Sequence, residues 1–429
     1  MNLAGSLDRV SPLDRFVFQW LNRQSADYFV DALCLARNAR ERVWCHLLGR
    51  LPNSLRVRVL RHRGRRGLNR WPAEASPAAT GRWLSELASE GNPVVRGAVD
   101  APGGRILMTL SQRQGPAGAV VFLFSAGERH PVAVLKSRPS GPGGARLTRE
   151  GRALCLLART LPASLQPTVP RVLARRREQD TELLLTGLPG RSAYVDLHRD
   201  LMPHRRVPVH FRHAARWLAQ FHRATSRTAR PVDLPELDRI ITRALVASRS
   251  LGEDRDLTWV PQLREWCART PIVTVACHGD FWARNLMLVT SAGCPPDTDV
   301  GVVDWEHFRP RALPSEDLFH FPLTYGLAFP WSRYRRADAL NAFRRTFLET
   351  NGVSREAARY LRAYCDGTGL DPSLLKPLFH LFLLTRAAGD ARGRSDDRAP
   401  WLEFDRLLTA SPESVFDHIP PGKGAAWAR

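Results

Sequence analysis

Three polar side chains, set between short apolar runs, could together carry out phosphoryl transfer. A carboxylate at Asp280 and an amide at Asn285 fall between residues 277 and 288, and a second carboxylate, Asp304, follows two valines. A carboxylate can accept the proton of a hydroxyl group, and an Asn/Asp pair offers the oxygen ligands that a hard divalent cation prefers. These are the groups that phosphoryl transfer from ATP in the presence of Mg²⁺ requires.

The sequence around these side chains predicts how they could meet. Apolar, β-branched runs predict three short strands, over residues 272–277, 285–289 and 300–304. A connector with Gly and Pro predicts a turn between the second and the third. If those two strands pair as an antiparallel hairpin, Asn285 and Asp304 lie at the same edge, and the loop of Asp280 opens onto that edge. The alternative is purely structural: Asp280 caps a helix, Asn285 fills a turn and Asp304 ends a strand.

A lysine and a glutamate upstream are predicted to form an ion pair. Apolar runs predict three consecutive strands and then a helix, over residues 105–111, 119–125, 131–137 and 146–160. Lys136 ends the apolar face of the third strand, and Glu150 lies on the apolar stripe of the helix. Because an isolated inward-facing charge loses its hydration, Lys136 is the expected partner of Glu150. Alternatively, Lys136 extends to solvent and Glu150 sits at a solvated edge.

Two further segments could contact a nucleotide. Gly115 and Gly118 lie between the first two predicted strands, where a flexible loop could cover a triphosphate, although a plain hairpin turn fits these residues equally well. Residues 181–188 predict another apolar strand, which ends at Leu188 before Pro189 and Gly190.

The motif around the first carboxylate resembles a known family. His278-Gly279-Asp280 with Asn285, followed by Asp304-Trp305-Glu306, is similar to the aminoglycoside phosphotransferase family, a branch of the protein-kinase-like fold. The resemblance covers about residues 100–390. It implies that Asp280 is the catalytic base and that Asn285 and Asp304 bind Mg²⁺. It also implies that His278 and Asp317 are structural supports of the catalytic loop.

The same resemblance assigns a nucleotide side. Lys136, held by Glu150, would contact the α- and β-phosphates of ATP, and Gly115 and Gly118 would belong to the loop that covers them. Leu188 would end a hinge whose backbone binds the adenine. One departure from the family lies at residue 284, where an arginine replaces the common glycine.

The implied fold class is α+β, a bilobal protein-kinase-like fold. A small antiparallel sheet with one key helix would form an ATP-binding N-lobe over residues 101–190. A larger, mostly helical C-lobe over residues 191–429 would carry the catalytic loop, the metal ligands and the acceptor site. Residues 1–100 would form an N-terminal helical, basic extension.

Composition favours a globular protein of the cytoplasm. Hydrophobic residues make up 44% of the 429 residues and charged residues 24%, which is typical of a folded chain. No apolar run reaches the length of a membrane-spanning helix, and the N-terminus lacks the apolar core of a signal peptide. The seven cysteines show no CxxC spacing, which favours reduced thiols over a disulfide framework or a zinc site.

The N-terminal extension contains a second pattern. Apolar residues near Phe16, Trp20 and Trp44 predict amphipathic helices, and residues 56–70 contain seven arginines and no acid. Residues 1–75 could therefore contact a membrane surface peripherally, or bind nucleic acid. The favoured interpretation is an extension that packs on the small lobe and exposes its arginines to solvent, so no nucleic-acid partner is expected.

The net charge of +21 bears on the acceptor. A strongly basic protein repels polycations at long range, so an anionic or neutral hydroxyl compound is the better guess. Gly279 stands where protein kinases carry an arginine, which favours a small molecule over a protein. The sequence thus predicts transfer of the γ-phosphate of ATP to a small-molecule hydroxyl, on a sugar, a sugar-derived metabolite or an antibiotic-like compound. The alternative is a non-catalytic kinase-like scaffold, anchored to membrane or nucleic acid by its basic N-terminus.

Overall fold

The computed structural model describes most of the chain beyond residue 76. The described residues are 16–17, 77–99, 105–111, 118–124, 131–139, 141–178, 181–188, 190–199, 202–226, 231–232, 234–249, 257–269, 272–288, 300–331, 338–390 and 401–420. They divide between two compact units: the first comprises Met1–Val195 and Met287–His307, and the second comprises Asp196–Leu286 and Phe308–Arg429.

A six-stranded antiparallel sheet organises the first unit. Its strands are β1 (Phe16–Val17), β2 (Arg105–Ser111), β3 (Gly118–Phe124), β4 (Ala133–Pro139), β5 (Arg171–Glu178) and β6 (Thr181–Gly187). They lie in the order β1-β2-β3-β4-β6-β5. The central strand β4 alternates between buried and half-buried residues, so that Leu135 and Lys136 point to opposite faces of the sheet.

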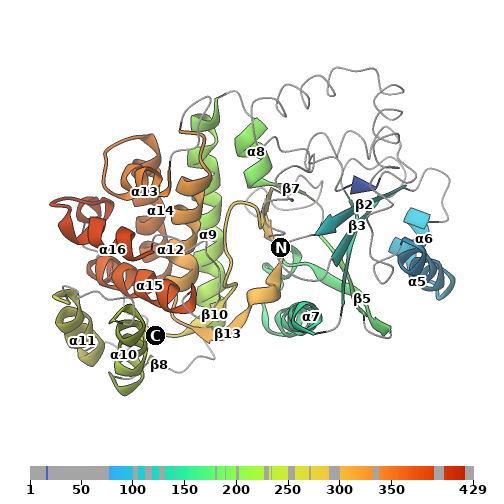
Figure 1. The fold of residues 1–429 in the computed structure, drawn as a ribbon, viewed down its shortest axis with the longest axis horizontal. Helices are drawn as coiled ribbons and strands as arrows, with labels where there is room; N and C mark the ends of the chain where they lie inside the picture. The colour runs from blue at the N-terminus through green and yellow to red at the C-terminus, as the bar shows by residue number, and fades with distance from the viewer. Residues whose placement is uncertain are drawn as a thin grey trace, which may run out of the picture. The chain divides into compact units, whose positions relative to one another are not determined.

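Helices cover both faces of this sheet (Figure 1). On one face lie α5 (Pro77–Ser89) and α6 (Pro93–Val99), and on the other lies α7 (Pro142–Thr160). Trp83 and Leu87 of α5 form an apolar cluster with sheet residues that include Val121, Leu135 and Leu185. Because this cluster occupies the face of Leu135, Lys136 is directed toward the face that α7 covers.

The N-terminal strand differs from the sequence-based expectation. Phe16 and Val17 were predicted to lie in an amphipathic helix, but they form β1, which pairs antiparallel with Thr109 and Met108 of β2. The edge of a sheet presents unpaired backbone groups, and this pairing satisfies them. The remaining predictions for residues 1–75, including the arginine-rich run, lie outside the described residues.

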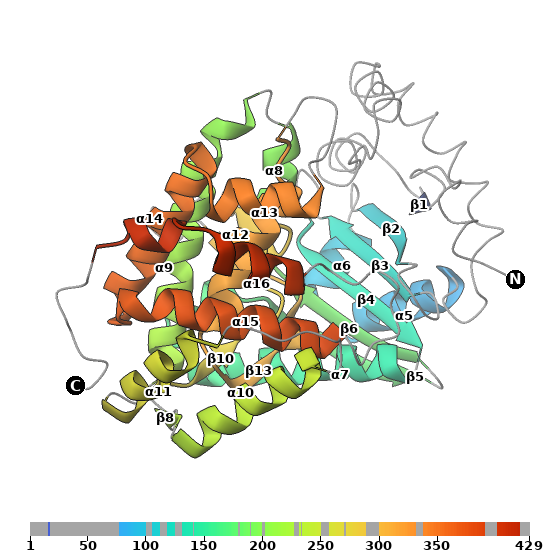
Figure 2. The same ribbon diagram turned by 60° about the vertical axis from the view of Figure 1, so that its left-hand side comes forward.

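The second unit is built mainly of helices (Figure 2). Its helices are α9 (Val207–Ser226), α10 (Leu234–Arg249), α11 (Trp259–Arg269), α12 (Ser315–Ala328), α13 (Ala339–Phe347), α14 (Gly352–Thr368), α15 (Leu375–Asp390) and α16 (Trp401–Ala410). Helix α9 packs along α14, and α12 contacts both α14 and α15. Buried aromatic rings join these helices, as where Phe211 of α9 meets Phe321 of α12 and Tyr360 of α14 edge-on.

Short strands carry the chain through the motif-bearing region. In the second unit, β8 (Pro231–Val232) pairs with β9 (Ile272–Val273), and β10 (Val275–Cys277) pairs with β13 (Arg309–Ala312). A three-stranded sheet has the order β12-β11-β7, with β12 (Val300–Val302), β11 (Leu286–Leu288) and β7 (Arg191–Ser192). The helix α8 (Ala193–Arg199) follows β7. The two runs predicted to pair, β11 and β12, are therefore neighbours.

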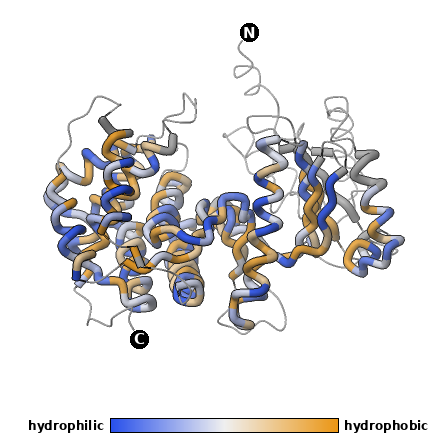
Figure 3. Tube along the Cα trace, turned by 90° about the horizontal axis from the view of Figure 1, so that it is seen from below, coloured by the Kyte–Doolittle hydropathy of each residue, from blue (hydrophilic) through white to orange (hydrophobic). Residues whose placement is uncertain are grey.

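Hydrophobic and hydrophilic residues alternate along the helices (Figure 3). This alternation is typical of helices that bury one side and expose the other. In the part of the chain that the structure describes, no helix is both long enough and apolar enough to cross a membrane.

Candidate active site

Lys136 is the centre of a charge cluster in the first unit. Its ammonium Nζ donates to both carboxylate oxygens of Glu150, at 2.7 and 2.8 Å, and to Oδ1 of Asp304 at 2.7 Å. Burial would lower the pKa of Lys136, but the two carboxylates outweigh it and raise the pKa above its ordinary value. The lysine therefore keeps its positive charge at neutral pH, as a group that neutralises phosphate must.

The surrounding elements explain why these three residues meet. Glu150 lies on the buried side of α7, which packs over β4, the strand of Lys136. The segment after Asp304 continues as a short 3-10 helix, η6 (Trp305–His307), which lies against α7. Arg149 of α7 donates to the carbonyl oxygen of Glu306 at 3.3 Å. Helix α7 thus fixes Glu150 directly and Asp304 through the neighbouring segment.

The backbone of Asp304 is unusual. Its φ angle is 73°, and it is the only non-glycine residue with positive φ among the described residues. Left-handed backbone costs free energy for an L-residue, although Asp tolerates it better than most, and such positions concentrate at functional sites. In this conformation the side chain of Asp304 remains partly exposed and contacts Lys136. The expected strand over residues 300–304 accordingly ends at Val302.

The structure describes two of the three residues that were predicted to contact a nucleotide in the covering loop and the hinge. Leu188 follows β6 and packs so closely on Gly301 of β12 that a Cβ at 301 would lie 2.6 Å from Leu188 Cδ2. Glycine is needed at 301 for this approach, which brings the predicted hinge next to the strand that leads to Asp304. Gly118 is the first residue of β3 and pairs with Ser111. Gly115 lies outside the described residues.

The second unit contains the loop of His278, Gly279 and Asp280. Asp317, at the start of α12, accepts hydrogen bonds from the backbone amides of His278 at 2.6 Å and Gly279 at 2.8 Å. Gly279 has a φ of 83°, a conformation that favours glycine. The amide of Asp280 donates to Nδ1 of His278 at 3.2 Å, so the fully buried imidazole braces the loop from inside. Two residues expected to support the loop, His278 and Asp317, thus both contact it.

A buried histidine behind this loop was not singled out from the sequence. His222 of α9 places Nε2 3.7 Å from Oδ2 of Asp317, and its Nδ1 lies 2.7 Å from the hydroxyl of Tyr364. Burial lowers the pKa of His222. Burial alone would raise the pKa of Asp317, but His222 and the loop amides reverse this and lower it. Asp317 is therefore a buried carboxylate, held ionised by the loop that it supports.

Three of these side chains have the composition of a metal site. His222, Cys277 and Asp317 bring ligand atoms within 4.8 Å of one another, and all three are buried. Both oxygens of Asp317 already accept backbone hydrogen bonds, and the thiol of Cys277 donates to the carbonyl of Leu313 at 3.4 Å. Burial raises the pKa of Cys277, which opposes the thiolate that a metal would require. The contacts fit a structural brace for the loop of Asp280.

Asp280 and Asn285 lie together at the mouth of the same loop. The amide nitrogen Nδ2 of Asn285 donates to the backbone oxygen of Asp280 at 2.9 Å and to Oδ2 of its side chain at 3.2 Å. The amide oxygen of Asn285 takes part in neither contact, and an amide oxygen is a ligand type that suits a hard cation. The second oxygen of Asp280, Oδ1, lies 3.1 Å from Nε2 of His320 in α12, a residue that the sequence pattern did not reveal.

Asn285 and Asp304 lie just outside the two strands that were predicted to contain them. Asn285 lies in the turn before β11 and belongs to the second unit, whereas Asp304 belongs to the first. The strands that follow and precede them, β11 and β12, are neighbours in one sheet. The joint binding of one cation by the two residues stays a prediction.

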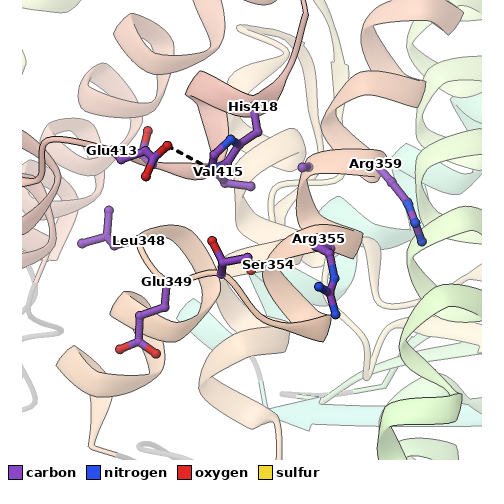
Figure 4. A pocket seen from close by; sticks show the side chains of 11 residues that line it. Leu348, Glu349, Ser354, Arg355, Arg359, Glu413, Val415 and His418 are labelled. Atoms are coloured by element: carbon purple, nitrogen blue, oxygen red, sulfur yellow. Dashed lines mark ion pairs between the residues drawn. The ribbon is translucent and has the colours of Figure 1, made fainter.

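A separate cavity lies elsewhere in the second unit (Figure 4). It has a volume of about 320 Å³ and is lined by the segment that follows α13, by α14 and by residues between 413 and 418, with Glu349, Arg355 and Arg359 among the lining residues. Glu413 and His418 form an ion pair of 3.8 Å at its rim. None of the predicted site residues lines it, so it is not part of the candidate active site.

The solved structures that match this chain include several small-molecule kinases. An aminoglycoside phosphotransferase, APH(3'')-Id from Streptomyces rimosus, is 20% identical over 72% of this chain and 98% of that chain, with a TM-score of 0.39. A glucosamine kinase in complex with glucosamine, ADP and inorganic phosphate is 14% identical over 78% and 83% of the two chains, with a TM-score of 0.38. An ethanolamine kinase from Plasmodium vivax is 12% identical over 84% and 95%, with a TM-score of 0.40. No curated protein sequence matched the chain.

The family comparison is more direct. The model of the APH phosphotransferase enzyme family matches residues 109–378, which is more than half of the chain. It confirms the resemblance drawn from the His-Gly-Asp motif, and with it the α+β kinase-like fold. It also confirms the predicted enzyme class, a small-molecule phosphotransferase with an alcohol group as acceptor. The chain belongs to the APH phosphotransferase enzyme family.

Proposed function

We propose that this protein transfers the γ-phosphate of ATP to a hydroxyl group of a small molecule and that Mg²⁺ is required. The observation that carries the proposal is the charge cluster in which Lys136 contacts Glu150 and the left-handed Asp304. A lysine held at full charge neutralises phosphate oxygens, and Asp304 with the amide oxygen of Asn285 offers ligands that suit Mg²⁺. Bound Mg²⁺ would neutralise charge that develops on the phosphates.

Asp280 is proposed as the base for the acceptor hydroxyl. Its side chain is 35% exposed while its neighbours in the loop are buried, so a substrate can reach it. The amide of Asn285 and the imidazole of His320 contact its two oxygens and hold the carboxylate in place. Asp317 and His278 keep the loop in place. This arrangement supports a role for Asp280 in orienting and deprotonating the hydroxyl.

Charge supports a neutral or anionic acceptor. The protein carries a net charge of +21, which disfavours the approach of polycations. A cation also lies beside the loop, because Arg386 of α15 donates to the carbonyl oxygen of Gly279 at 3.3 Å. A sugar or a sugar phosphate therefore fits better than a polycationic antibiotic.

Nucleotide binding is tested by thermal denaturation of the full-length protein with Mg²⁺-ATP. We expect the melting temperature to rise with Mg²⁺-ATP and the rise to disappear in Lys136→Met. The matched control is Lys376→Met, a lysine of α15 that pairs with Asp417 at 3.8 Å. If neither the natural protein nor the control responds to Mg²⁺-ATP, the chain acts as a non-catalytic scaffold and the proposal is wrong.

The acceptor is identified by mass spectrometry. The protein and Mg²⁺-ATP are incubated with neutral sugars, sugar phosphates, ethanolamine, glucosamine and streptomycin, and each is examined for the mass gain of one phosphate. We expect the gain on a neutral or anionic compound. A gain confined to streptomycin would contradict the proposal of a neutral or anionic acceptor. It would still support transfer of phosphate from ATP to a hydroxyl group.

A further inference from the structure

A histidine of α12 contacts the proposed catalytic base, and no sequence pattern marks it. His320 is buried, with 7% of its surface exposed, and its Nε2 lies 3.1 Å from Oδ1 of Asp280. It stands three residues after Asp317, and residues three apart share one face of a helix. The same face of α12 thus holds the backbone of the loop through Asp317 and the side chain of Asp280 through His320.

The two oxygens of Asp280 have different partners. Oδ2 accepts from the amide of Asn285, and Oδ1 faces the imidazole of His320. Two hydrogen bonds from separate elements fix the plane of a carboxylate, whereas one would leave it free to rotate about χ2. Asn285 comes from the loop itself, whereas His320 is a contact that ties the carboxylate to helix α12.

The protonation state of His320 decides which atom donates. Charged groups face it from α12 (Asp317), from the loop (Asp280) and from α15 (Arg386). Burial and Arg386 together lower the pKa of His320 against the opposing effect of the two aspartates. The ring is therefore neutral at physiological pH and carries one N–H. A carboxylate in the ionised form proposed for the base can only accept, so the hydrogen in the contact with Oδ1 lies on Nε2.

The other ring nitrogen supports this assignment. Among the residues that the structure describes, no donor or acceptor reaches Nδ1 of His320, although the atom is buried. An N–H at that position would be a buried donor without an acceptor, which is unfavourable. The tautomer with hydrogen on Nε2 leaves Nδ1 as an acceptor instead, and unpaired buried acceptors are more common in proteins than unpaired buried donors.

We propose that His320 is a positioning residue for phosphoryl transfer: its Nε2–H donates to Oδ1 of Asp280 and holds that carboxylate in the orientation in which it accepts the hydroxyl proton. This inference rests on the proposed function of Asp280. A misplacement of about 1 Å in a reacting group can lower a rate by about 100-fold, so loss of the bond is expected to affect turnover more than binding.

Two substitutions separate positioning from packing. His320→Leu removes the donor, and His320→Gln places an amide N–H close to the site of Nε2. In full-length protein, phosphate release from Mg²⁺-ATP with water as acceptor should fall about 10- to 100-fold in kcat for His320→Leu, with KM for ATP changed by less than about twofold. His320→Gln should recover most of the loss. Equal losses in the Leu and Gln variants would overturn the proposal.

The second unit offers a matched control. His380 of α15 is also buried and lies, through Nδ1, 2.7 Å from Oδ1 of Asp405. His380→Leu breaks a buried His–Asp contact of the same kind but should leave kcat unchanged. A loss of kcat as large as that of His320→Leu would mean that any damage to the helical core impairs turnover, which would contradict a specific role for His320.

Nitrogen-15 spectra of the histidine rings test the contact without activity. At about pH 7.5 the natural protein should show His320, assigned from His320→Gln, as the neutral Nε2–H tautomer. Asp280→Ala should shift this resonance and leave that of His380 unchanged. A Nδ1–H tautomer, or a resonance insensitive to Asp280, would sink the inference. If the natural protein neither binds Mg²⁺-ATP nor phosphorylates any of the compounds, the proposed function fails, while these spectra still decide whether His320 holds Asp280.

Discussion

Asp304 combines a charged side chain with a backbone conformation that L-residues rarely adopt. Its φ of 73° and its 2.7 Å contact with Lys136 occur directly after a buried strand. Neither feature contributes to packing, because the side chain is 38% exposed. Conformational cost at an exposed charged residue is typical of a site that serves chemistry.

Substitution of Asp304 tests this interpretation. Asp304→Asn retains a residue that tolerates the left-handed region but removes the negative charge. We expect the affinity for ATP in the presence of Mg²⁺ to fall by about tenfold or more, because a neutral amide binds Mg²⁺ more weakly than a carboxylate. Isothermal titration calorimetry with Mg²⁺, and again with EDTA, measures the change. Affinity that is equal with and without Mg²⁺ in the natural protein would contradict the role of Asp304.

Asp280 should matter for turnover and not for nucleotide binding. Asp280→Ala removes the proposed base, and general-base catalysis typically contributes about 10²- to 10⁴-fold, so we expect kcat to fall by that order. Affinity for Mg²⁺-ATP, measured by calorimetry, should remain close to that of the natural protein. Asp366→Ala, at an exposed aspartate that pairs with Arg362 on α14, is the control and should leave both quantities unchanged. Normal turnover in Asp280→Ala would remove it from the mechanism.

Helix α12 is the element that organises the second unit. Its first turn holds the loop of Asp280 through Asp317, the next turn contacts Asp280 through His320, and Phe321 packs against Phe211 of α9. Farther along, Gly326 lies against Thr346 of α13, with no room for a Cβ. A displacement of this helix would therefore be transmitted to the loop.

Two glycine substitutions test the packing of α12. Gly326→Ala places a methyl group against Thr346, whose hydroxyl is tied to the carbonyl of Ala342, so we expect a loss of about 1–3 kcal/mol in the free energy of unfolding. Gly352→Ala, at the start of α14, meets no atom within 4 Å and should be neutral or slightly stabilising. Urea denaturation measures both. Equal stability of the two variants would show that α12 and α13 are not closely packed at this point.

The folded protein should lose stability in acid, because ionisable groups are buried next to the loop of Asp280. Burial lowers the pKa of His222 and His320 below 6.5, so the unfolded chain binds protons more readily than the folded one. Their stabilising effect is complete above about pH 6.5 and decreases as the pH falls below it. Asp317, whose pKa lies below 3.8, adds a further loss in stronger acid, as the pH falls below about 3.8.

Urea denaturation at a series of pH values checks this dependence. We expect the midpoint of the natural protein to fall between about pH 7 and pH 5. His222→Gln should weaken that fall, whereas His418→Gln, at an exposed histidine, should not change it. A midpoint independent of pH over this range would show that the two histidines are accessible to protons in the folded state.

Local sequence patterns were enough to predict the polar residues of the site and the strands and helix that carry them. The alternation of β4 and the helical stripe of α7 predicted that Lys136 and Glu150 would face each other, and the structure has them 2.7 Å apart. The His-Gly-Asp motif, together with Asn285 and Asp304, indicated the family, and the family model confirmed it. These features are accessible because strand and helix periodicities are encoded by residues close together in the chain. The strand ends were less accurate, since Asn285 and Asp304 lie just outside β11 and β12.

The side chains that surround the loop of Asp280 could be identified only from the tertiary structure. His320 lies 40 residues from its partner Asp280, and Arg386 lies 107 residues from Gly279. His222 approaches Asp317 from a different helix. No local pattern encodes such contacts, because each depends on how helices distant in sequence pack together. For the same reason the left-handed backbone of Asp304 could not be predicted, since the surrounding contacts hold the chain in that conformation.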